Sequence, residues 1–342
     1  MIDRNSVLII AEAGVNHNGD MQLAYQLIDA AVDAGVDIVK FQTFKTELLV
    51  NKQAKKADYQ IANTGNHNSS QYDMLKQLEL TEEQHYQLAA YCKQKGIQFW
   101  STAFDIESVH FLKSMGITLG KVPSGEITNL PYLQVMAANF DTLIVSTGMC
   151  TTEEVEAAIV ALENAGARRD KITILHCTTE YPAPLQDVHL NAMKAMGSYF
   201  NMRYGYSDHT EGIAIPIAAV ALGATVIEKH FTLNKNLPGP DHKASLEPHE
   251  LKAMVEGIRA VEKALGSSLK QPSEVELKNK LVARKSVCTA TDLPQGTIIH
   301  ETHLVMLRPG TGISPMELSE VLGKKLQINL SAGTPLTWEM LA

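Results

Sequence analysis

The chain has 342 residues, 45% of them hydrophobic and 20% charged, which suits one barrel-sized domain with a large core plus a small module. Its formal net charge is -8 at pH 7, without any block of about five like charges, which argues against a nucleic-acid footprint or a polybasic membrane patch. An acidic surface says nothing about the sign of the field inside a cleft, so an anionic substrate is not excluded.

Two apolar stretches and the cysteines bear on where the protein acts. The run of roughly five apolar residues before Glu12 and the stretch 213–227 are too short for a signal-peptide core or a membrane span. The cysteines form no C-x-x-C pair, which indicates neither a zinc ribbon nor a disulfide framework. They are Cys92, Cys150, Cys177 and Cys288. We therefore expect a cytoplasmic protein whose cysteines are reduced and structural.

Eight short apolar runs, rich in β-branched residues, alternate with segments long enough to form helices. The runs cover residues 7–10, 36–41, 97–100, 118–122, 142–145, 172–176, 202–206 and 225–227. Parallel strands that are covered by helices on their outer face have this composition, and the spacing indicates βαβ crossovers.

The intervening segments carry helix start and stop signals. Two patterns of Thr followed three residues later by Gln or Glu predict capping boxes, and glycines after two apolar stripes predict helix ends. The residues are Thr81 with Gln84, Thr151 with Glu154, Gly35 and Gly266.

Together these elements predict an α/β chain whose residues 1–268 form a (β/α)8 TIM barrel, with the long segment 43–80 as a candidate active-site loop. A doubly wound open sheet is the rival, but Gly14 and Gly19 do not make the GxGxxG turn that it would need for a nucleotide. The polar stretch 269–281 is a predicted linker. Residues 282–342 are a predicted small β-rich domain, with apolar runs at 286–289, 297–299 and 326–330.

Polar residues follow all eight predicted strands, and in a barrel they meet at the C-terminal mouth, where active sites lie. We expect all of them to point into one mouth. They are Glu12, Asn16, His17, Lys40, Gln42, Thr43, Ser101, Thr102, Lys121, Ser124, Glu126, Ser146, Thr147, His176, Thr178, Thr179, Tyr181, Ser207, Asp208, His209, Glu228 and His230.

Lys40 and Lys121 lie at the ends of two of the predicted strands. Lysines with Ser and Thr hydroxyls nearby suit a phosphate or a carboxylate. A buried lysine at a strand end is also the Schiff-base nucleophile of an aldolase, and the residues alone leave both readings open.

His209 and His230 end adjacent strands, so their imidazoles can approach one divalent ion that would polarise a carbonyl. Asp208 and Glu228 could then supply hydrogen bonds to these ligands. A metal-free His-Asp acid-base pair is the competing account.

The segments IAEAGVNHNG, VKFQTF, KVPSGEITNLP, VSTGM, LHCTTEYPAP, GYSDHT, IEKHFTL, GPDH and RPGTGIS resemble the sialic acid synthase family along the whole chain. The resemblance implies a TIM barrel joined to a small antifreeze-like (SAF) domain. It also implies a domain-swapped homodimer in which each SAF domain covers the partner's active site.

The resemblance further implies roles for particular residues. Lys40, Thr102, Lys121, Ser124, Ser146 and Thr179 would hold phosphoenolpyruvate. His209 and His230 would bind a divalent ion, usually Mn²⁺, with Mg²⁺ or Co²⁺ as alternatives. Gln42, Glu126, Tyr181, Asp241 and Arg308 would contact the sugar, Arg308 from the partner chain. The catalytic set would be Glu12, His209, His230 and Tyr181. Some family members carry Asn in place of Thr179, and many carry Pro in place of Ala103.

The implied reaction joins C3 of phosphoenolpyruvate to the aldehyde of an open-chain N-acetylated sugar, after which water adds at C2 and phosphate leaves. Either Glu12 or a metal-bound water would activate that water. The implied activity is that of an N-acetylneuraminate or legionaminate synthase, with pseudaminic acid synthase as an alternative.

Two other kinds of protein compete with this interpretation. A Schiff-base pyruvate aldolase would use Lys40 or Lys121 as its nucleophile. A non-enzymatic sugar- or ice-binding protein is suggested by the antifreeze-like tail, although such a protein needs neither the paired histidines nor the paired lysines.

Overall fold

The computed structural model describes residues 6–64 and 69–342, and the chain forms two compact units, Met1–Gly266 and Ser267–Ala342. The first unit ends two residues before the predicted boundary at 268. Among the described residues, every helix is too short or too polar to cross a membrane.

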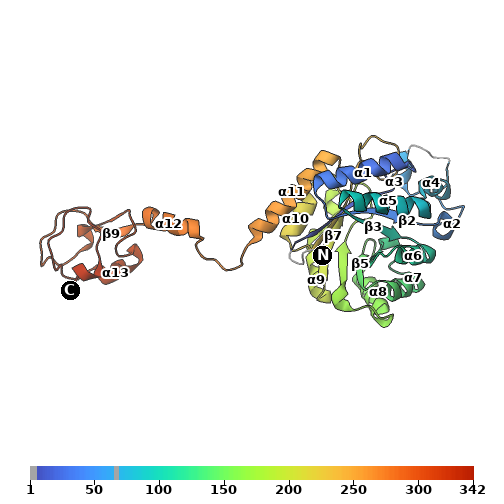
Figure 1. Ribbon diagram of the computed structural model, residues 1–342. Helices are drawn as coiled ribbons and strands as arrows, with labels where there is room; N and C mark the ends of the chain where they lie inside the picture. Colours follow the sequence, from blue (N-terminus) through green and yellow to red (C-terminus); the bar gives the residue numbers. More distant parts are fainter. Residues whose placement is uncertain (1–5, 65–68) are drawn as a thin grey trace. The chain divides into compact units, whose positions relative to one another are not determined.

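The first unit is a ring of eight parallel strands surrounded by helices (Figure 1). The strands are β1 (Leu8–Gly14), β2 (Ile38–Thr43), β3 (Gln98–Ala103), β4 (Leu119–Val122), β5 (Thr142–Ser146), β6 (Ile172–His176), β7 (Arg203–Asp208) and β8 (Val226–His230). Their hydrogen-bonded order is β3-β2-β1-β8-β7-β6-β5-β4. The eight predicted strands and the TIM-type barrel are confirmed, and several strands continue two to four residues beyond the predicted runs.

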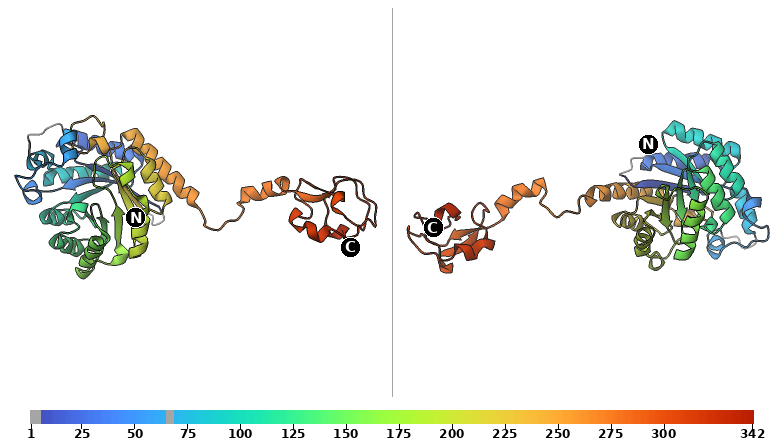
Figure 2. Two further views of the ribbon diagram at one scale, coloured as in Figure 1. Left: turned by 180° about the vertical axis from the view of Figure 1, so that it is seen from behind. Right: turned by 90° about the horizontal axis from the view of Figure 1, so that it is seen from below.

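Helices cover the outer face of the ring, as both views in Figure 2 show. They are α1 (Met21–Ala34), α5 (Glu82–Lys95), α6 (Ile106–Ser114), α7 (Leu130–Asn139), α8 (Thr152–Asn164), α9 (Leu190–Phe200), α10 (Ala214–Ala221) and α11 (Pro248–Leu265). Three shorter helices, α2 (Thr46–Leu49), α3 (Asp58–Thr64) and α4 (Gln71–Leu78), lie at one end of the ring. The helices α2, α3 and α4 are an insertion between β2 and α5.

The predicted helix ends are formed by the expected chemistry. Gly35 closes α1 with φ 75° and ψ 32°, a left-handed conformation that glycine adopts without a steric penalty. Thr81 with Gln84 and Thr151 with Glu154 form capping boxes, in which each side chain bonds the other residue's backbone N–H.

The ladder of the barrel ends at β3 and β4, and side chains join these two strands. Trp100 donates from Nε1 to the carbonyl of Leu119 at 2.6 Å. The Tyr132 hydroxyl, from α7, donates to the carbonyl of Ala103 at 2.7 Å and lies 3.4 Å from that of Lys121. Side-chain donors therefore satisfy carbonyls at the seam of the ring.

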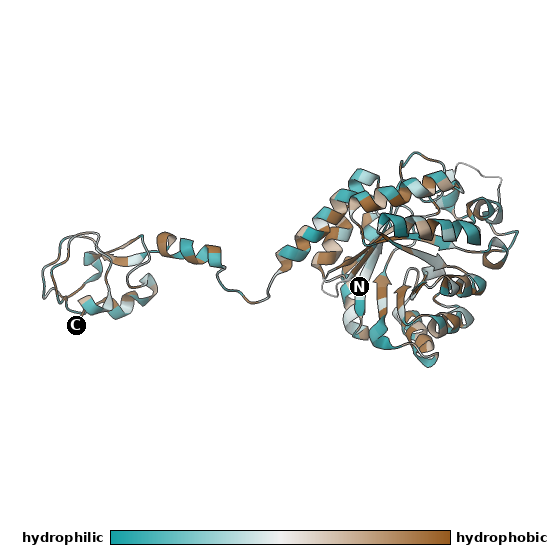
Figure 3. Ribbon diagram, in the orientation of Figure 1, coloured by the Kyte–Doolittle hydropathy of each residue, from teal (hydrophilic) through white to brown (hydrophobic). Residues whose placement is uncertain are grey.

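The apolar core has an inner and an outer part. The inner part fills the N-terminal half of the barrel with Leu8, Ile10, Ile38, Trp100, Ile144, Leu175 and Val226. The outer part lies between the strands and the helices. Helix α10 is apolar along most of its length (Figure 3) because it packs against β7, β8 and α11.

The second unit contains α12 (Glu274–Ala283), an antiparallel pair formed by β9 (Ser286–Thr289) and β10 (Leu304–Leu307), and the short helix α13 (Leu318–Val321). Its own core includes Val287, Ile299 and Leu336. The predicted runs 297–299 and 326–330 form only isolated bridges, such as Ile298 with Lys325. Prolines and glycines interrupt these runs, which limits the length of any ladder.

The predicted linker 269–281 is largely helical. Helix α12 starts with a capping box of Ser273 and Glu276, and none of its ten residues is buried. The sequence SEVELKN was interpreted as linker because of its polarity, but its first four residues are a helix-start signal.

Candidate active site

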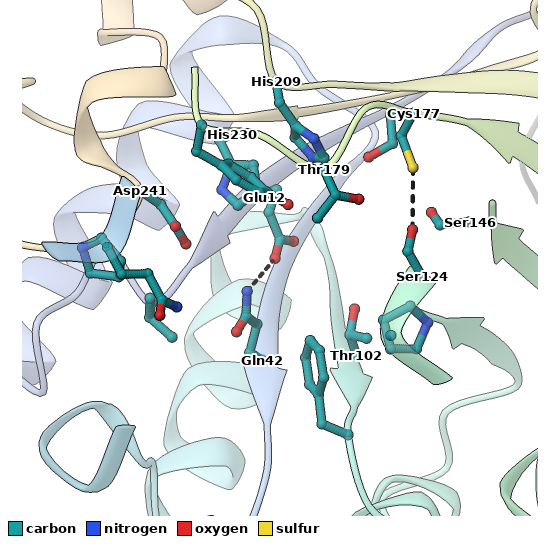
Figure 4. A pocket seen from close by; sticks show the side chains of 18 of the residues that line it. Glu12, Gln42, Thr102, Ser124, Ser146, Cys177, Thr179, His209, His230 and Asp241 are labelled. Atoms are coloured by element: carbon teal, nitrogen blue, oxygen red, sulfur yellow. Dashed lines mark hydrogen bonds between the residues drawn. The ribbon is translucent and has the colours of Figure 1, made fainter. Parts of the chain in front are cut away.

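A cavity of about 370 Å³ opens at the C-terminal end of the barrel. Residues from the ends of the strands line one part of it, and residues from α2, α3 and α4 line another. The segment 43–80, predicted as a candidate active-site loop, therefore contributes to the lining of this cavity. Figure 4 shows Ser124, Ser146 and Cys177 on one side, Asp241 on the other, and Glu12, Gln42, His209 and His230 between them.

Strand alternation explains which polar side chains reach this cavity. Residues at every second position of a strand face the same side, so the residues two positions after the inner apolar layer also point inward. This second layer is polar and lines the cavity. It consists of Glu12, Lys40, Thr102, Lys121, Ser146, Ser207 and Glu228.

The same alternation corrects the expectation that every polar residue at a strand end faces the mouth. The residues outside the cavity lining are Asn16, His17, Thr43, Ser101, Glu126, Thr147, His176, Thr178 and Asp208. The Thr43 hydroxyl, for example, forms hydrogen bonds with Ser101 Oγ at 2.6 Å and with His85 Nε2 of α5 at 2.8 Å. Thr43 and Ser101 face outward because β2 and β3 continue through them, beyond the apolar segments on which the prediction was based.

The two lysines and two glutamates form a buried network inside the barrel. Lys40 Nζ lies 2.6 Å from Glu12 Oε2 and 3.5 Å from Glu228 Oε2. Lys121 Nζ lies 3.3 Å from Glu228 Oε1. Glu228 thus bridges both lysines, whereas the sequence suggested that it supports the histidines.

Hydroxyl groups complete the surroundings of the lysines. Lys40 donates to Thr102 Oγ1 at 2.7 Å, and Lys121 donates to Ser146 Oγ at 2.5 Å. Ser207 donates to Glu228 Oε1 at 3.0 Å. These contacts hold both ammonium groups in place, so their positions are set before any ligand arrives.

Burial and charge affect the carboxyl groups in opposite ways. Burial, aided by the negative charge of Glu228, raises the pKa of Glu12 to about 7 despite the nearby Lys40. Burial also acts to raise the pKa of Glu228, but the charges of Lys121 and Lys40 outweigh it and lower this pKa to about 2. Glu228 is therefore a permanent anion at neutral pH, while Glu12 can gain or lose a proton.

The lysines differ as well. Burial opposes the charge of Lys40, but Glu12 and Glu228 outweigh this effect and raise the pKa of the lysine. For Lys121 burial dominates and lowers the pKa.

A second group of donors lies beside Lys121. The backbone N–H of Gly148 donates to Ser124 Oγ at 3.0 Å, and Cys177 Sγ lies 3.3 Å from the same oxygen. Thr179 Oγ1 is buried without a hydrogen-bond partner. A Cβ on Gly148 would lie 2.3 Å from this Thr179 oxygen, so glycine is required there for close packing. The Thr179 hydroxyl lines the cavity and is therefore available to a ligand.

His209 and His230 come together as predicted, with ring centroids 5.5 Å apart. His209 donates from Nδ1 to the carbonyl of Thr178 at 2.6 Å, which leaves Nε2 as the lone-pair nitrogen. His230 Nδ1 is buried without a hydrogen-bond partner. Burial lowers the pKa of His209 to about 4 and that of His230 well below its ordinary value, so both rings are neutral.

Neutral imidazoles are the form that binds a metal ion, so this pair fits a divalent ion held by two protein ligands. In the part of the chain that the structure describes, no group of three His, Cys, Asp or Glu residues gathers as a complete protein site. A site built here would leave coordination positions for substrate oxygens.

Behind the histidines, Asp208 and Lys229 form an ion pair with 2.6 Å between Oδ2 and Nζ and no exposure of either side chain. Lys229 also donates to the carbonyl of Thr210, and Asp208 Oδ1 accepts from the Thr210 N–H at 2.9 Å. The sequence suggested that Asp208 supports a metal ligand, but its side chain instead fixes the ends of β7 and β8.

Aromatic and acidic groups form the side of the cavity opposite Ser124. Tyr181 lies over His209 with centroids 4.2 Å apart, and Tyr59 of α3 lies 5.1 Å from Tyr181. Asp241 is buried, which raises its pKa to about 7. Asn63 donates to the carbonyls of Tyr181 and Pro240, at 3.2 and 2.7 Å, and so attaches α3 to both loops.

The structure gathers most of the predicted site residues of the first unit and leaves Glu126 outside the cavity lining. The residues in the cavity are Glu12, Lys40, Gln42, Thr102, Lys121, Ser124, Ser146, Thr179, Tyr181, His209, His230 and Asp241. Glu126 is half-buried and accepts from Asn129 Nδ2 at 2.6 Å. Arg308 is exposed in the second unit.

Sequence reasoning missed two kinds of cavity residue. Cys177 was assigned a structural role, although its position two residues after Leu175 of the inner layer could have indicated an inward side chain. Nothing in the sequence indicated that Tyr59 and Gln60 of α3 line a cavity, because helical periodicity does not show what a helix face contacts. The four cysteines are all free.

The fold and site define a (β/α)8-barrel protein with a polar cavity at its mouth and a small second domain. Residues 27–270 match the NeuB family, and residues 284–342 match the SAF domain. The chain belongs to the NeuB family.

Three similar proteins illustrate the relationship. N,N'-diacetyllegionaminic acid synthase of Legionella pneumophila is 52% identical over 97% of this chain and 93% of its own. Pseudaminic acid synthase of Campylobacter jejuni is 34% identical over 96% and 95%. The crystal structure of N-acetylneuraminic acid synthetase from Leptospira borgpetersenii has a TM-score of 0.70 and 33% identity, covering 81% of this chain and 90% of that one.

Proposed function

We propose that this protein condenses phosphoenolpyruvate with an open-chain 2,4-diacetamido-trideoxy sugar, releasing phosphate and forming a legionaminic acid. The observation that supports this most directly is the arrangement of one cavity. A pair of neutral histidines lies between a lysine-rich end and a second end formed by Tyr181 and Asp241. The choice of legionaminic acid over its relatives is supported by the 52% identity to the Legionella synthase, against 34% to the pseudaminic acid synthase.

At the lysine-rich end, we propose that Lys40, Lys121 and the hydroxyls of Thr102, Ser124, Ser146 and Thr179 hold the phosphate and carboxylate of phosphoenolpyruvate. Both lysines are already ordered by Glu12 and Glu228, so little side-chain entropy is lost when the ligand binds. The unpaired Thr179 hydroxyl gains its hydrogen bond at that step.

Between the two ends, His209 and His230 are proposed to hold a divalent ion, Mn²⁺ in the first instance and Mg²⁺ or Co²⁺ as alternatives. Such an ion supplies Lewis-acid polarisation of the sugar aldehyde. The hydrogen bond from His209 Nδ1 to Thr178 keeps the imidazole in the tautomer that presents Nε2.

Glu12 is proposed to move the protons. In the reaction, C3 of phosphoenolpyruvate bonds to the aldehyde carbon, and the aldehyde oxygen must take up a proton. Water then bonds to C2 and gives up a proton, and the C–O bond to phosphate breaks. A carboxyl with a pKa of about 7 can first donate and then accept a proton, so one residue serves both steps.

At the second end, Gln42, Tyr181 and Asp241 are proposed to contact the sugar. Glu126 and the partner subunit's Arg308 are proposed to join them in a domain-swapped homodimer. The exposed apolar side chains of α12, among them Val275 at 71% and Val282 at 70%, support an assembly that covers this helix. We further propose that the protein acts in the cytoplasm, where phosphoenolpyruvate is made.

The lowered pKa of Lys121 favours one competing function, a Schiff-base aldolase, because a neutral amine is the nucleophile in that reaction. Borohydride trapping with pyruvate tests this possibility. A covalent adduct on Lys121 would replace the proposed function with the aldolase.

The test of the proposed function is phosphate release from phosphoenolpyruvate in the presence of Mn²⁺. N-acetylmannosamine and the 2,4-diacetamido-trideoxy sugar are offered in parallel, each with and without a chelator. We expect chelator-sensitive release with the diacetamido sugar. An absence of release with both sugars would overturn the proposal.

A further inference from the structure

One wall of the cavity is apolar, and the polar site does not explain it. Six of the seven residues in one hydrophobic cluster also line the cavity. These six residues, which we call the apolar lobe, are Val15, Leu49, Met74, Leu75, Leu78 and Phe104. The cluster is separate from the two large cores between the strands and the outer helices. These side chains therefore pack mainly against one another and expose the rest of their surface to the cavity.

The apolar lobe is built by the insertion after β2 and is held in place independently of any ligand. Glu79 Oε2, at the end of α4, accepts from the backbone N–H and the hydroxyl of Thr46, at 2.9 and 2.6 Å, which joins α4 to α2. Ser70 and Asp73 form a capping box at the start of α4. The wall is therefore preformed, which favours selection by shape and polarity.

Two amide side chains border the apolar wall. Gln60 Oε1 accepts from the backbone N–H of Ala57 at 3.0 Å and from Gln71 Nε2 at 3.4 Å. Both glutamines line the cavity. An amide group of a ligand could bond to these side chains while its methyl group contacts the aliphatic wall, which is the combination that an acetamido group needs.

We propose that the apolar lobe determines acceptor specificity by binding the C6 methyl and the C4 acetamido group of the sugar. This inference rests on the proposed function, since it concerns the acceptor of that reaction. N-acetylmannosamine has hydroxyls at both positions, and burying them against leucine and methionine side chains leaves their hydrogen bonds unmade. An apolar pocket discriminates in this way by about tenfold to 200-fold.

The chain offers a matched pair of leucines for the test. Leu49 belongs to the apolar lobe, whereas its neighbour Leu48 on the same helix is 51% exposed and lies outside the cavity lining. We compare Leu49→Asn with Leu48→Asn, measuring kcat/KM for the 2,4-diacetamido-trideoxy sugar, N-acetylmannosamine and 6-deoxy-N-acetylmannosamine. Leu75→Asn on α4 repeats the measurement from a second helix and replaces Leu49→Asn if that variant does not fold.

The wild-type protein should prefer the diacetamido sugar, and 6-deoxy-N-acetylmannosamine should fall between the other two sugars. Leu49→Asn should reduce the preference for the diacetamido sugar by about tenfold, mainly through slower turnover of that sugar, while Leu48→Asn retains it. If Leu49→Asn and Leu75→Asn slow all three sugars equally, the lobe does not select the acceptor, although the proposed function stands. If the wild-type protein releases no phosphate with any sugar, the proposed function itself fails.

Discussion

The lysine site and the apolar lobe of the cavity are built by different parts of the chain. Lys40, Lys121 and their partners project from the strands of the barrel, where each side chain is buried and held by short hydrogen bonds or ion pairs. The apolar lobe comes mainly from short helices in the insertion between β2 and α5. The core of the fold thus determines the position of the lysines, whereas the lobe depends on a segment that lies outside this core.

This difference separates the reaction from the choice of acceptor. Changes to α2 or α4 alter the surface that the sugar contacts without disturbing the strand register that places the lysines and histidines. Substitutions at the strand ends should therefore abolish turnover of every sugar, whereas substitutions in the lobe should redistribute activity among sugars.

The largest effect is expected from Lys121→Met. This variant tests whether the reaction depends on the lysines that the strands hold in place. The change leaves Glu228 with one cation fewer in a buried site, and it should cost about 3–5 kcal/mol in the free energy of unfolding. Activity should fall about a hundredfold to a thousandfold, since the protein loses a positively charged group that contacts the anionic substrate. Urea denaturation and steady-state kinetics measure the two effects.

Lys45→Met is the matched control, because Lys45 pairs with Glu107 at 2.6 Å but is about half exposed. It should change neither quantity appreciably. Adding Glu228→Gln to Lys121→Met should restore part of the stability and none of the activity. Recovery of activity in the double variant would mean that Lys121 serves only to neutralise Glu228.

The second prediction concerns the histidine pair, His209 and His230. His230→Ala should remove bound metal and turnover together while the barrel remains folded, because one of two protein ligands is lost. Metal content by mass spectrometry and circular dichroism on the same sample check this. His249→Ala, on the exposed surface of α11, is the control. Full turnover in the metal-depleted His230→Ala variant would exclude the proposed ion.

The inward positions of the two lysines were largely predictable from the sequence, whereas the apolar lobe was not. Lys40 and Lys121 lie within apolar strands at positions that must face inward, so local periodicity is sufficient to place them. Their common partner Glu228 could not be inferred, because β4 and β8 are distant along the chain and meet only when the barrel closes.

Two further differences have physical causes. Thr43 and Ser101 were expected in the cavity because they follow apolar runs, but the strands continue through them and the alternation turns both outward. Met74 and Leu78 repeat at the four-residue spacing of any amphipathic helix. This pattern says that one face of α4 is covered, but it does not distinguish a cavity wall from a core.

Asp241, at the sugar end, gives a prediction about pH. Burial raises its pKa from 3.8 to about 7 in the folded state, so the folded protein retains a proton that the unfolded chain has lost. The resulting loss of stability is absent below about pH 4 and complete above about pH 7. Asp241→Asn removes this penalty, so the variant should exceed the wild type in unfolding free energy above pH 7, by at most a few kcal/mol, and match it at pH 4.

Denaturant unfolding of both proteins from pH 4 to 8 measures this difference. Asp141→Asn, at an exposed carboxyl, should follow the wild type at every pH. In the kinetic assay Asp241→Asn should raise the KM for the sugar more than that for phosphoenolpyruvate. A stability difference that does not vary with pH would mean that Asp241 is ionised in the folded protein.

The smallest effect is expected from Arg308→Ala. This variant tests whether the second domain contributes to sugar binding. If the partner subunit's Arg308 contacts the acyl group, its loss removes one charge-assisted hydrogen bond, so the KM for the sugar should rise about tenfold and that for phosphoenolpyruvate should not change. Lys325→Ala, another exposed cation of the second unit, is the control. A selective rise in the KM for phosphoenolpyruvate would instead assign Arg308 to the lysine end, and the second domain would then contribute to the reaction centre common to all acceptors.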